Sequence, residues 1–546
     1  MTEKLTPAEI AAAERVAGVT YTEAERGQIC EAIEGQILSA VARRKSSFRN
    51  DEPPATRFDP RLPGFVMPVA ERVQLRDAAP GALPDDPEDI AFAPVTQLSG
   101  WIANGALSSR RLTEIYLDRI AALNPRLFCF ATVAADRALT EADQADRLLA
   151  GGTYLGPLHG IPYGLKDLFD TEGIVTAWGA EPYRDRVPEN DAAVVERLRA
   201  AGAVLLGKTA VGALAYGDVW YGGTTRNPWN LNEGSGGSSA GSASATAAGL
   251  CGFAIGTETL GSITNPSHRC GTTGLRPTFG RISRRGAMAL CPSLDKVGPI
   301  CRSVEDTALV LAALNGHDPL DRGSIAATFA FDATAGIAGL RLGYLPDAFG
   351  EGATEVDHAA LAAAKALGID VIEVRLPDLP YQSLFNTVSA EAAAMFEDLT
   401  LSDLDDTLTW QDAGAWPNMF RMARFLSAVD HVQLDRLRYR VMLALDAAFR
   451  GVDALIGPFD TGPMLIASNF TGHPCLHLRA GFLQSRTRAR TTLGGGKAIE
   501  AEGPLFRVPQ GISLWGRLFD EGKILQLGLA LEEALGVAAE RPGLAG

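Results

Sequence analysis

The longest stretch of the chain without a charged residue runs from Gly234 to Thr257 and consists mainly of Gly, Ser, Ala and Thr. Such small side chains allow close packing, and the part from Ala240 to Leu250 has helical propensity. A membrane-spanning helix of this length is dominated by large apolar residues, which are scarce here. The stretch therefore predicts a loop that leads into a tightly buried helix and no transmembrane segment.

Strand-like and helix-like patterns alternate around this stretch. Residues 203–207 form an apolar strand-like run, and the preceding AAVVERLRAAG from Ala192 has the apolar period of a helix. Such alternation is typical of a sheet covered by helices. Hydrophobic residues make up 46% and charged residues 21% of the 546 residues, as in ordinary globular proteins. We expect an α/β fold with one large domain, whose mostly parallel mixed central sheet is covered by helices.

The N-terminal region has a different pattern. Thr6 and Pro7 predict the start of one amphipathic helix, and Thr20 or Thr22 predicts the start of a second, which ends near Lys45. The following residues, up to about Pro87, are rich in Pro, Asp, Arg and Gly and have no clear period. They are expected to form an extended arm or linker.

These patterns give a domain assignment. Residues 1–88 are assigned to a small helical N-terminal appendage with its arm, and residues 89–546 to the main domain. Within the main domain, Ser108 predicts the start of a helix that Pro125 ends. Residues 355–450 contain conventional helical patterns and are the candidate for a variable helical cap. A homodimer formed through the amphipathic helices of the appendage is one hypothesis for its role.

Charge and cysteine usage exclude several classes of function. The formal net charge is −15 and the pI is about 5.1, which gives nucleic-acid phosphates no general attraction. The seven cysteines include no CxxC pair, which favours reduced thiols. The N-terminus has no apolar segment typical of a signal peptide, so we expect a cytoplasmic protein.

Histidines offer a rival chemistry that the sequence disfavours. His473 and His477 are four residues apart, a spacing found in metal sites, but Pro474 breaks the helix that would align them. A conventional Ser/His/Asp hydrolase places its serine on a GxSxG elbow, and we do not interpret GGSSAG from Gly236 as such an elbow. We expect no metal and no cofactor.

Three glycine-rich segments contain the candidate catalytic residues. Lys166 lies in GIPYGLKDLFD, Ser238 in GSGGSSAGSAS and Ser262 in GTETLGSITNP. A serine hydroxyl is a weak nucleophile that needs a neighbouring base. A lysine can be that base if an apolar environment favours its neutral amine, and the second serine can relay the proton. The three residues therefore indicate a serine hydrolase without a catalytic histidine.

These segments, with further blocks at GLRPTFGRIS, PSLDKVGPICRSVEDTALVLAALNGHDPLD and FTGHPCLHL, closely resemble the amidase signature family of Ser-cisSer-Lys amide hydrolases. The resemblance covers roughly residues 90–540, so it identifies the main domain as catalytic. It implies that Ser262 is the acyl-forming nucleophile and that Ser238, after a cis peptide bond, relays the proton. Lys166 is then the ultimate base.

Other residues are expected to support this site. Backbone N–H groups of the oxyanion loop, defined as residues 259–262, are the natural oxyanion-hole donors: Thr259, Leu260, Gly261 and Ser262. Asp167 is expected to brace the loop after Lys166, and Gly237 to permit the tight turn before Ser238. Ser239 is expected either to hydrogen-bond within the relay or to act as a loop-capping hydroxyl.

The sequence departs from the family pattern beside the nucleophile. Leu260 stands where the family has glycine, and Thr264 where it has arginine. The acid–arginine bridge that normally steadies this loop is therefore expected to be absent. Glu258 then needs another partner, or the loop is looser. Arg276 stands where the family often has lysine and keeps the charge.

The predicted function is hydrolysis of the C–N bond of a small, mainly apolar amide through an acyl-serine, with activity on esters or carbamates as a further hypothesis. One alternative is the glutamine-hydrolysing amidase subunit of a tRNA-dependent amidotransferase, and another is a non-catalytic scaffold. No nucleic-acid or membrane partner is expected. Several residues are candidates for an apolar substrate pocket: Trp178, Trp220, Tyr221, Trp229, Trp416, Met419, Phe420 and Phe425.

Overall fold

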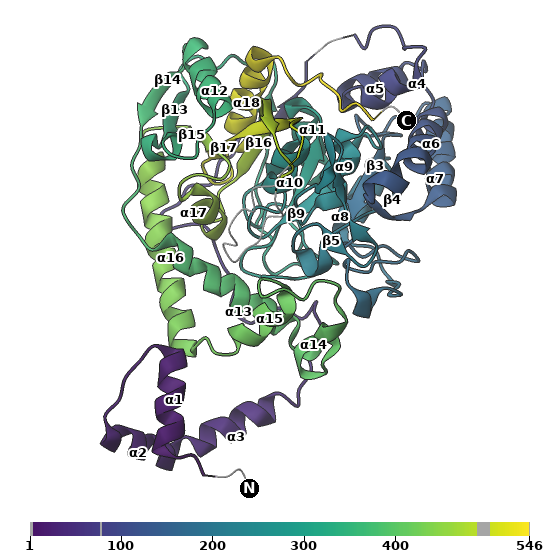
Figure 1. Cartoon of the computed structure of the whole chain (residues 1–546). Coiled ribbons are helices and arrows are strands. Elements are labelled where there is room, and N and C mark those ends of the chain that lie inside the picture. Colours follow the sequence, from purple (N-terminus) through teal and green to yellow (C-terminus); the bar gives the residue numbers. More distant parts are fainter. Residues whose placement is uncertain (1–3, 77–78, 489–502, 545–546) are drawn as a thin grey trace.

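A large mixed sheet forms the centre of the computed structural model, which describes residues 4–76, 79–488 and 503–544 (Figure 1). In these residues the sheet has 11 strands. In spatial order they are β14 (Asp370–Glu373), β13 (Arg341–Tyr344), β15 (Ala454–Pro458), β17 (Phe506–Gly516), β16 (Cys475–Ser485), β10 (Thr273–Arg276), β11 (Lys296–Cys301), β9 (Phe253–Glu258), β3 (Pro162–Lys166), β4 (Val204–Thr209) and β2 (Phe130–Val133).

The predicted α/β class and mixed sheet are confirmed, but parallel pairing is confined to two groups of strands. Strands β9, β3 and β4 are parallel to one another, as are β14, β13 and β15. The strands between these groups pair antiparallel, from β15 through β17, β16, β10 and β11 to β9. The strand-and-helix alternation that predicts parallel pairing is found around β3 and β4 and does not extend to these central strands.

The elements around β3 and β4 follow their sequence patterns. Every residue of both strands is buried, as expected for strands covered on both faces. The Ser108 side chain caps helix α6 (Ser109–Leu127) by accepting a hydrogen bond from the Arg111 N–H. The predicted end at Pro125 is wrong by two residues, because the helix continues to Leu127 and Phe128 then takes a φ of 51°.

The small-residue stretch forms a loop and a buried helix, as predicted. Helix α9 (Ala240–Ala247) has all eight residues buried. A Cβ atom at Gly241 would lie 2.1 Å from the Cys129 carbonyl oxygen and 2.3 Å from the Ala210 backbone nitrogen. Only glycine fits at this position, so α9 packs directly against the backbone of neighbouring segments.

The N-terminal region comprises three short helices and an extended arm. These are α1 (Pro7–Ala17), α2 (Glu23–Ala32) and α3 (Glu34–Arg43), so the predicted second helix is divided at Ile33. Arg43 forms an ion pair with Glu397, which ties α3 to α14 (Glu397–Leu401) at the lower edge of Figure 1. The arm then follows the main domain, and its β1 (Arg72–Gln74) pairs in parallel with β12 (Ala330–Asp332).

Further helices cover the sheet and extend below it (Figure 1). They are α4 (Pro87–Phe92), α5 (Val95–Ala103), α7 (Ala135–Ala150), α8 (Ala193–Ala200), α10 (Thr264–Cys270), α11 (Val304–Leu314), α12 (Glu355–Ala366), α13 (Phe385–Met395), α15 (Trp416–Ala423), α16 (Ala428–Phe449), α17 (Met464–Phe470) and α18 (Glu521–Leu535). Short strands β5 to β8 span Val219–Trp220, Gly223–Thr224, Arg226–Asn227 and Asn230–Gly234. None of the helices in the described residues is long and apolar enough to cross a membrane.

The segment 355–450, the proposed cap, has two structural parts. Its first part belongs to the sheet, because β14 pairs with β13 and α12 contacts β16, β17 and α18. Helices α13 to α16 form the second part, which extends away from the strands.

Candidate active site

Lys166 is the last residue of β3 and its side chain is completely buried. Its Nζ atom lies 2.9 Å from Ser238 Oγ, 3.0 Å from Ser239 Oγ and 2.8 Å from Thr257 Oγ1. Burial lowers the pKa of Lys166 well below its ordinary value, although the carboxylates of Asp295 and Glu258 oppose the shift. A neutral amine that can accept a proton is therefore placed against the Ser238 hydroxyl.

Ser238 follows a loop that fits closely against another backbone segment. The Gly237–Ser238 peptide bond is cis, as the resemblance implies. A Cβ atom at Gly237 would lie 1.8 Å from the Gly217 carbonyl oxygen, so this position requires glycine. The N–H of Ser239 donates to the Ser262 carbonyl oxygen at 3.1 Å, which joins the segments of the two serines.

Ser239 combines the two roles that the sequence left open. Its hydroxyl lies within hydrogen-bond distance of Lys166, which places it beside the proposed relay. The same oxygen donates to the Thr257 carbonyl at 3.0 Å and accepts from the Thr257 N–H at 3.1 Å. Ser239 therefore also fixes the loop against the end of β9.

Ser262 lies on the wall of an open pocket and is 9% exposed. In the described residues no hydrogen bond joins the hydroxyls of Ser238 and Ser262. Large apolar side chains form much of the pocket wall: Leu260, Leu290, Val388, Trp416, Phe459 and Leu465. Its polar groups include Asp218, Asn265 and Asp460. Of the predicted aromatic and Met candidates, only Trp416 is in the described lining of this pocket.

The oxyanion loop connects β9 to Ile263, the residue that precedes α10. In the described residues none of its four backbone N–H groups donates to a protein acceptor. Gly261 has a φ of 84°, in the left-handed region that favours glycine. Unused N–H groups beside a serine that faces a pocket are available to a developing oxyanion.

Glu258 takes another partner, the first of the two alternatives that the sequence left open, and that partner is again an arginine. Glu258 Oε1 accepts a hydrogen bond from Arg276 Nη1 at 2.6 Å, and both side chains are fully buried. Its Oε2 atom accepts from the N–H groups of Ile263 and Thr264 at 2.9 Å. Burial alone raises the pKa of Glu258, but the Arg276 charge and these donors hold it at about 2. Arg276, from β10 on the far side of β11, thus replaces the missing arginine at position 264.

Two further contacts support Glu258 and were not predicted from the sequence. The Thr264 hydroxyl donates to Glu258 Oε2 at 3.1 Å, and Asn469 Nδ2 donates to Oε1 at 3.0 Å. Asn469 lies on α17, far from Glu258 in sequence. The Arg276 charge was noted in the sequence, but nothing in the local pattern indicated its partner.

Asp167 lies beside the site and contacts the following loop. Its Oδ2 atom accepts from the Ala177 N–H at 3.2 Å, and its Oδ1 atom lies 3.6 Å from Lys208 Nζ. Burial raises the pKa of Asp167 to about 6 and lowers that of Lys208 to about 8. This geometry fits the bracing role expected for Asp167, and the sequence did not indicate the buried Lys208.

Asp295 is a second acid near the oxyanion loop, partly buried, that sequence reasoning did not single out. Its Oδ1 atom accepts from the Thr259 hydroxyl at 2.6 Å, and its Oδ2 atom accepts from the N–H groups of Leu290 and Cys291 at 2.9 Å. Asp295 is part of the PSLDKVGP block. This block contributed to the family resemblance, but the sequence did not indicate a role for Asp295.

The described residues contain no group of three or more His, Cys, Asp or Glu side chains that could hold a metal ion. The Nδ1 atom of His473 hydrogen-bonds to Thr471 Oγ1 at 2.7 Å, and that of His477 to Ser513 Oγ at 3.0 Å. Burial lowers the pKa of each imidazole to about 3. These contacts identify both as neutral core side chains.

A buried lysine hydrogen-bonded to Ser238 and Ser239, with Ser262 facing a pocket, defines a serine hydrolase that uses lysine in place of histidine. The chain belongs to the amidase family, whose model, described as Amidase, matches residues 111–525. It is an amidase signature serine hydrolase, and its substrate class is an amide.

Individual relatives agree with this assignment. The chain is similar to a subunit of the Glutamyl-tRNA(Gln) amidotransferase of Geobacter metallireducens, with 34% identity over 476 residues, 80% of this chain and 96% of the relative. It is also similar to the peptide amidase from Stenotrophomonas maltophilia, with a TM-score of 0.70 and 30% identity, over 83% of this chain and 99% of that one. A chain from a vestigial protein complex that reveals the origins of an s-triazine catabolic enzyme has a TM-score of 0.71 and 31% identity, over 81% and 98% of the two chains.

Proposed function

We propose that the protein hydrolyses the C–N bond of a small, mainly apolar amide through an acyl-enzyme on Ser262. Esters and carbamates of similar shape are further candidate substrates. The observation that carries the proposal is the contact between the buried Lys166 amine and the Ser238 hydroxyl, beside a loop with unused N–H groups.

Attack begins with two coupled proton transfers. Neutral Lys166 accepts the proton of Ser238 as Ser238 accepts the proton of Ser262, and Ser262 Oγ forms a bond to the substrate carbonyl carbon. The carbonyl π electrons move to oxygen, and the N–H groups of the oxyanion loop stabilise the resulting negative charge. Because the Ser238 and Ser262 hydroxyls are not hydrogen-bonded in this structure, Ser262 rotates toward Ser238 before transfer.

Collapse of this intermediate breaks the C–N bond. The proton held by Lys166 returns through Ser238 to the departing nitrogen, so the amine leaves neutral and the acyl group remains on Ser262. A water molecule then attacks the ester, with Lys166 and Ser238 accepting its proton by the same route. Return of a proton to Ser262 releases the carboxylic acid and restores the enzyme.

The pocket supports an acyl group with an apolar body. Trp416, Leu465 and Phe459 provide much of the apolar wall. A substrate whose uncharged acyl part contacts these residues places its carbonyl beside Ser262. Asp460 favours a substrate that also carries a hydrogen-bond donor.

Glutamine hydrolysis is the second candidate, because of the similarity to a subunit of an amidotransferase. Free glutamine carries an α-carboxylate that needs a cationic partner. In the described lining of the Ser262 pocket the charged side chains are Asp218 and Asp460, and no Lys or Arg is present. This charge pattern favours the apolar amide over glutamine.

The test is intact-mass measurement of the protein after reaction with a fluorophosphonate, together with turnover of aryl and alkyl amides, esters, carbamates and glutamine. We expect one adduct, lost in Ser262→Ala and retained in Ser402→Ala, an exposed serine control. Turnover of apolar amides that requires Ser262 supports the main proposal. Turnover of glutamine alone supports the second, and a folded protein without adduct or turnover contradicts both.

A further inference from the structure

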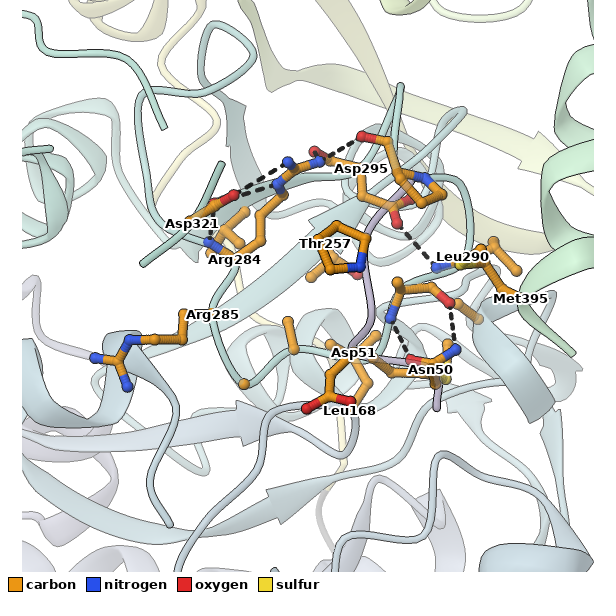
Figure 2. Close-up of a pocket in the computed structure, with 18 of the residues that line it drawn as sticks. Asn50, Asp51, Leu168, Thr257, Arg284, Arg285, Leu290, Asp295, Asp321 and Met395 are labelled. Atoms are coloured by element: carbon orange, nitrogen blue, oxygen red, sulfur yellow. Dashed lines mark hydrogen bonds and ion pairs between the residues drawn. The ribbon is translucent and has the colours of Figure 1, made fainter. Parts of the chain in front are cut away.

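A second pocket lies behind the oxyanion loop and is partly walled by the N-terminal arm (Figure 2). Residues 50–53 of the arm line it together with segment 284–297, and Thr257 and Thr259 contribute from the side of the active site. The Ser262 pocket shares Ala215, Thr259 and Leu290 with it. The arm therefore reaches the rear of the proposed catalytic centre.

Asn50 attaches the arm to this region by two hydrogen bonds to one residue. Asn50 Nδ2 donates to the Ala289 carbonyl oxygen at 2.8 Å, and the Ala289 N–H donates to Asn50 Oδ1 at 2.8 Å. Figure 2 shows this pair beside Leu290. The side-chain amide satisfies both backbone groups of Ala289 and thus fixes the backbone at that point.

The next residues along the chain donate to a partly buried carboxylate, that of Asp295. The N–H groups of Leu290 and Cys291 both bond to Asp295 Oδ2, and the Thr259 hydroxyl bonds to Asp295 Oδ1. Burial raises the pKa of Asp295, and the three contacts, all donors to its carboxylate, oppose that shift and favour the ionised form. Asp295 therefore joins the segment held by Asn50 to the first residue of the oxyanion loop.

We propose that Asn50 and Asp295 are positioning residues that hold the oxyanion loop in its working geometry, which makes the N-terminal arm a functional part of the active site. This inference rests on the proposed reaction at Ser262. Direct contacts join the arm to the oxyanion loop. Asn50 bonds to Ala289, the next two residues after Ala289 bond to Asp295, and Asp295 bonds to Thr259. A small displacement of oxyanion donors reduces the rate strongly, because their alignment is what stabilises the transition state.

Asp295 also contributes charge at Lys166. Its carboxylate and that of Glu258 favour the protonated lysine, against the effect of burial. Removing the Asp295 charge therefore lowers the pKa of Lys166 further. Other titratable groups on the elements that surround Lys166 remain in place: Asp167, Lys208 and Lys296.

The experiment compares full-length Asn50→Ala, Asp295→Asn and the double variant with wild type. The control is Arg57→Ala, which removes a different contact of the arm, from Arg57 to the Arg322 carbonyl oxygen. Measurements are kcat, KM, the pH profile and the rate at which a fluorophosphonate labels Ser262. Amide hydrogen exchange in residues 257–262 is measured in parallel.

We expect Asn50→Ala to lower kcat and the labelling rate about tenfold, with KM within about twofold. Asp295→Asn should lower them about 100-fold and move the acidic limb of the pH profile to lower pH. The double variant should be no slower than Asp295→Asn, because both residues act through one connection. Arg57→Ala should match wild type.

Equal behaviour of Asn50→Ala and Arg57→Ala, or losses confined to KM, would overturn the inference. If Asp295→Asn does not fold, Thr259→Val removes the hydroxyl contact alone and should give the same loss in kcat. Failure of the proposed function has a different result, because Ser262 is then unlabelled in wild type. Hydrogen exchange in the loop still reports whether the arm positions it, since exchange does not depend on turnover.

Discussion

Helices α9 and α16 are held in the molecule by opposite means. In α9 all eight residues are buried, and most have side chains no larger than serine. In α16, which is 22 residues long, the buried residues form one face: Leu434, Arg438, Val441, Met442, Leu445 and Phe449. Close backbone contact fixes α9, whereas side chains of ordinary size attach one side of α16.

The two kinds of packing differ in how precisely they fix the position of a helix and in how much sequence change they tolerate. Helix α9 begins directly after Ser238 and Ser239, so an error in its position moves the proposed relay. Helix α16 is joined through a long side chain to the segment that precedes Asp295. Arg438 donates to the Ser293 carbonyl oxygen at 2.8 Å and to Ser293 Oγ at 3.0 Å. We infer that residues near α9 tolerate little change, while the exposed faces of α15 and α16 can vary in sequence at small cost.

The largest effect is expected for Lys166→Met. Methionine fills the buried space of the lysine stem but cannot accept a proton, so kcat should fall by about 10⁴-fold with the thermal midpoint near or above that of wild type. Wild-type activity should rise with pH as Lys166 loses its proton, at a pH below the ordinary lysine pKa. Pre-steady-state acylation, followed across pH in wild type and variant, measures the loss of rate and the acidic limb. Retention of the acidic limb in the variant would assign that limb to another group.

The next largest effect concerns the support of the oxyanion loop. Glu258→Gln leaves Arg276 buried without its partner and should cost about 3–5 kcal/mol in the free energy of unfolding. The folded-state pKa of Glu258 is about 2 against an ordinary value of 4.5. The carboxylate therefore contributes stability that is fully present above about pH 4.5 and is lost as pH falls toward 2.

Denaturant unfolding of wild type and Glu258→Gln between pH 7 and pH 3 checks this prediction. The difference between the two proteins should shrink as the solution becomes acidic. A difference that is constant across this range would show that the Glu258 charge does not provide the stability.

Gly241→Ala should destabilise the protein by about 3 kcal/mol, because the new methyl group meets backbone atoms of Cys129 and Ala210 that have little freedom to move. The matched control is Gly451→Ala, just after α16, where a Cβ atom meets nothing within 4 Å. The control should change the free energy by no more than about 0.5 kcal/mol. Chemical denaturation measures both, and equal losses would remove the contrast between the two helices.

The smallest effect is expected for Phe425→Ser, between α15 and α16, where the aromatic side chain is 67% exposed. Stability should change by no more than about 0.5 kcal/mol. Phe420→Ala, in the same segment but fully buried, should cost about 3–5 kcal/mol. A large loss in Phe425→Ser would show that the exposed side of this region is also constrained, for example by a partner.

Local sequence patterns correctly predicted those elements that a few adjacent residues determine. Ser108 caps its helix as expected, and the small residues from Ala240 onward form a buried helix. The position of Lys166 against Ser238 also agrees with the family resemblance, which supplies the long-range pairing that no local pattern contains.

The errors arise where partners are distant in sequence. The bond from Arg276 to Glu258 depends on strand order, since β10 and β9 flank β11 in the sheet. The antiparallel centre of the sheet is likewise set by tertiary pairing, as are the contacts of Asn469 and Asn50. Sequence therefore predicted which residues occupy the site more successfully than how they are supported.

The pairing of β1 with β12 has a consequence for synthesis of the chain. Arg72 lies opposite Ala330, so the arm leaves the ribosome about 260 residues before its partner strand exists. At a translation rate of about 5–20 residues per second, this delay is roughly 13–50 s. During that time residues 72–74 have no partner strand, so this part of the arm joins the molecule late, and active enzyme should accumulate only after residue 330 has emerged.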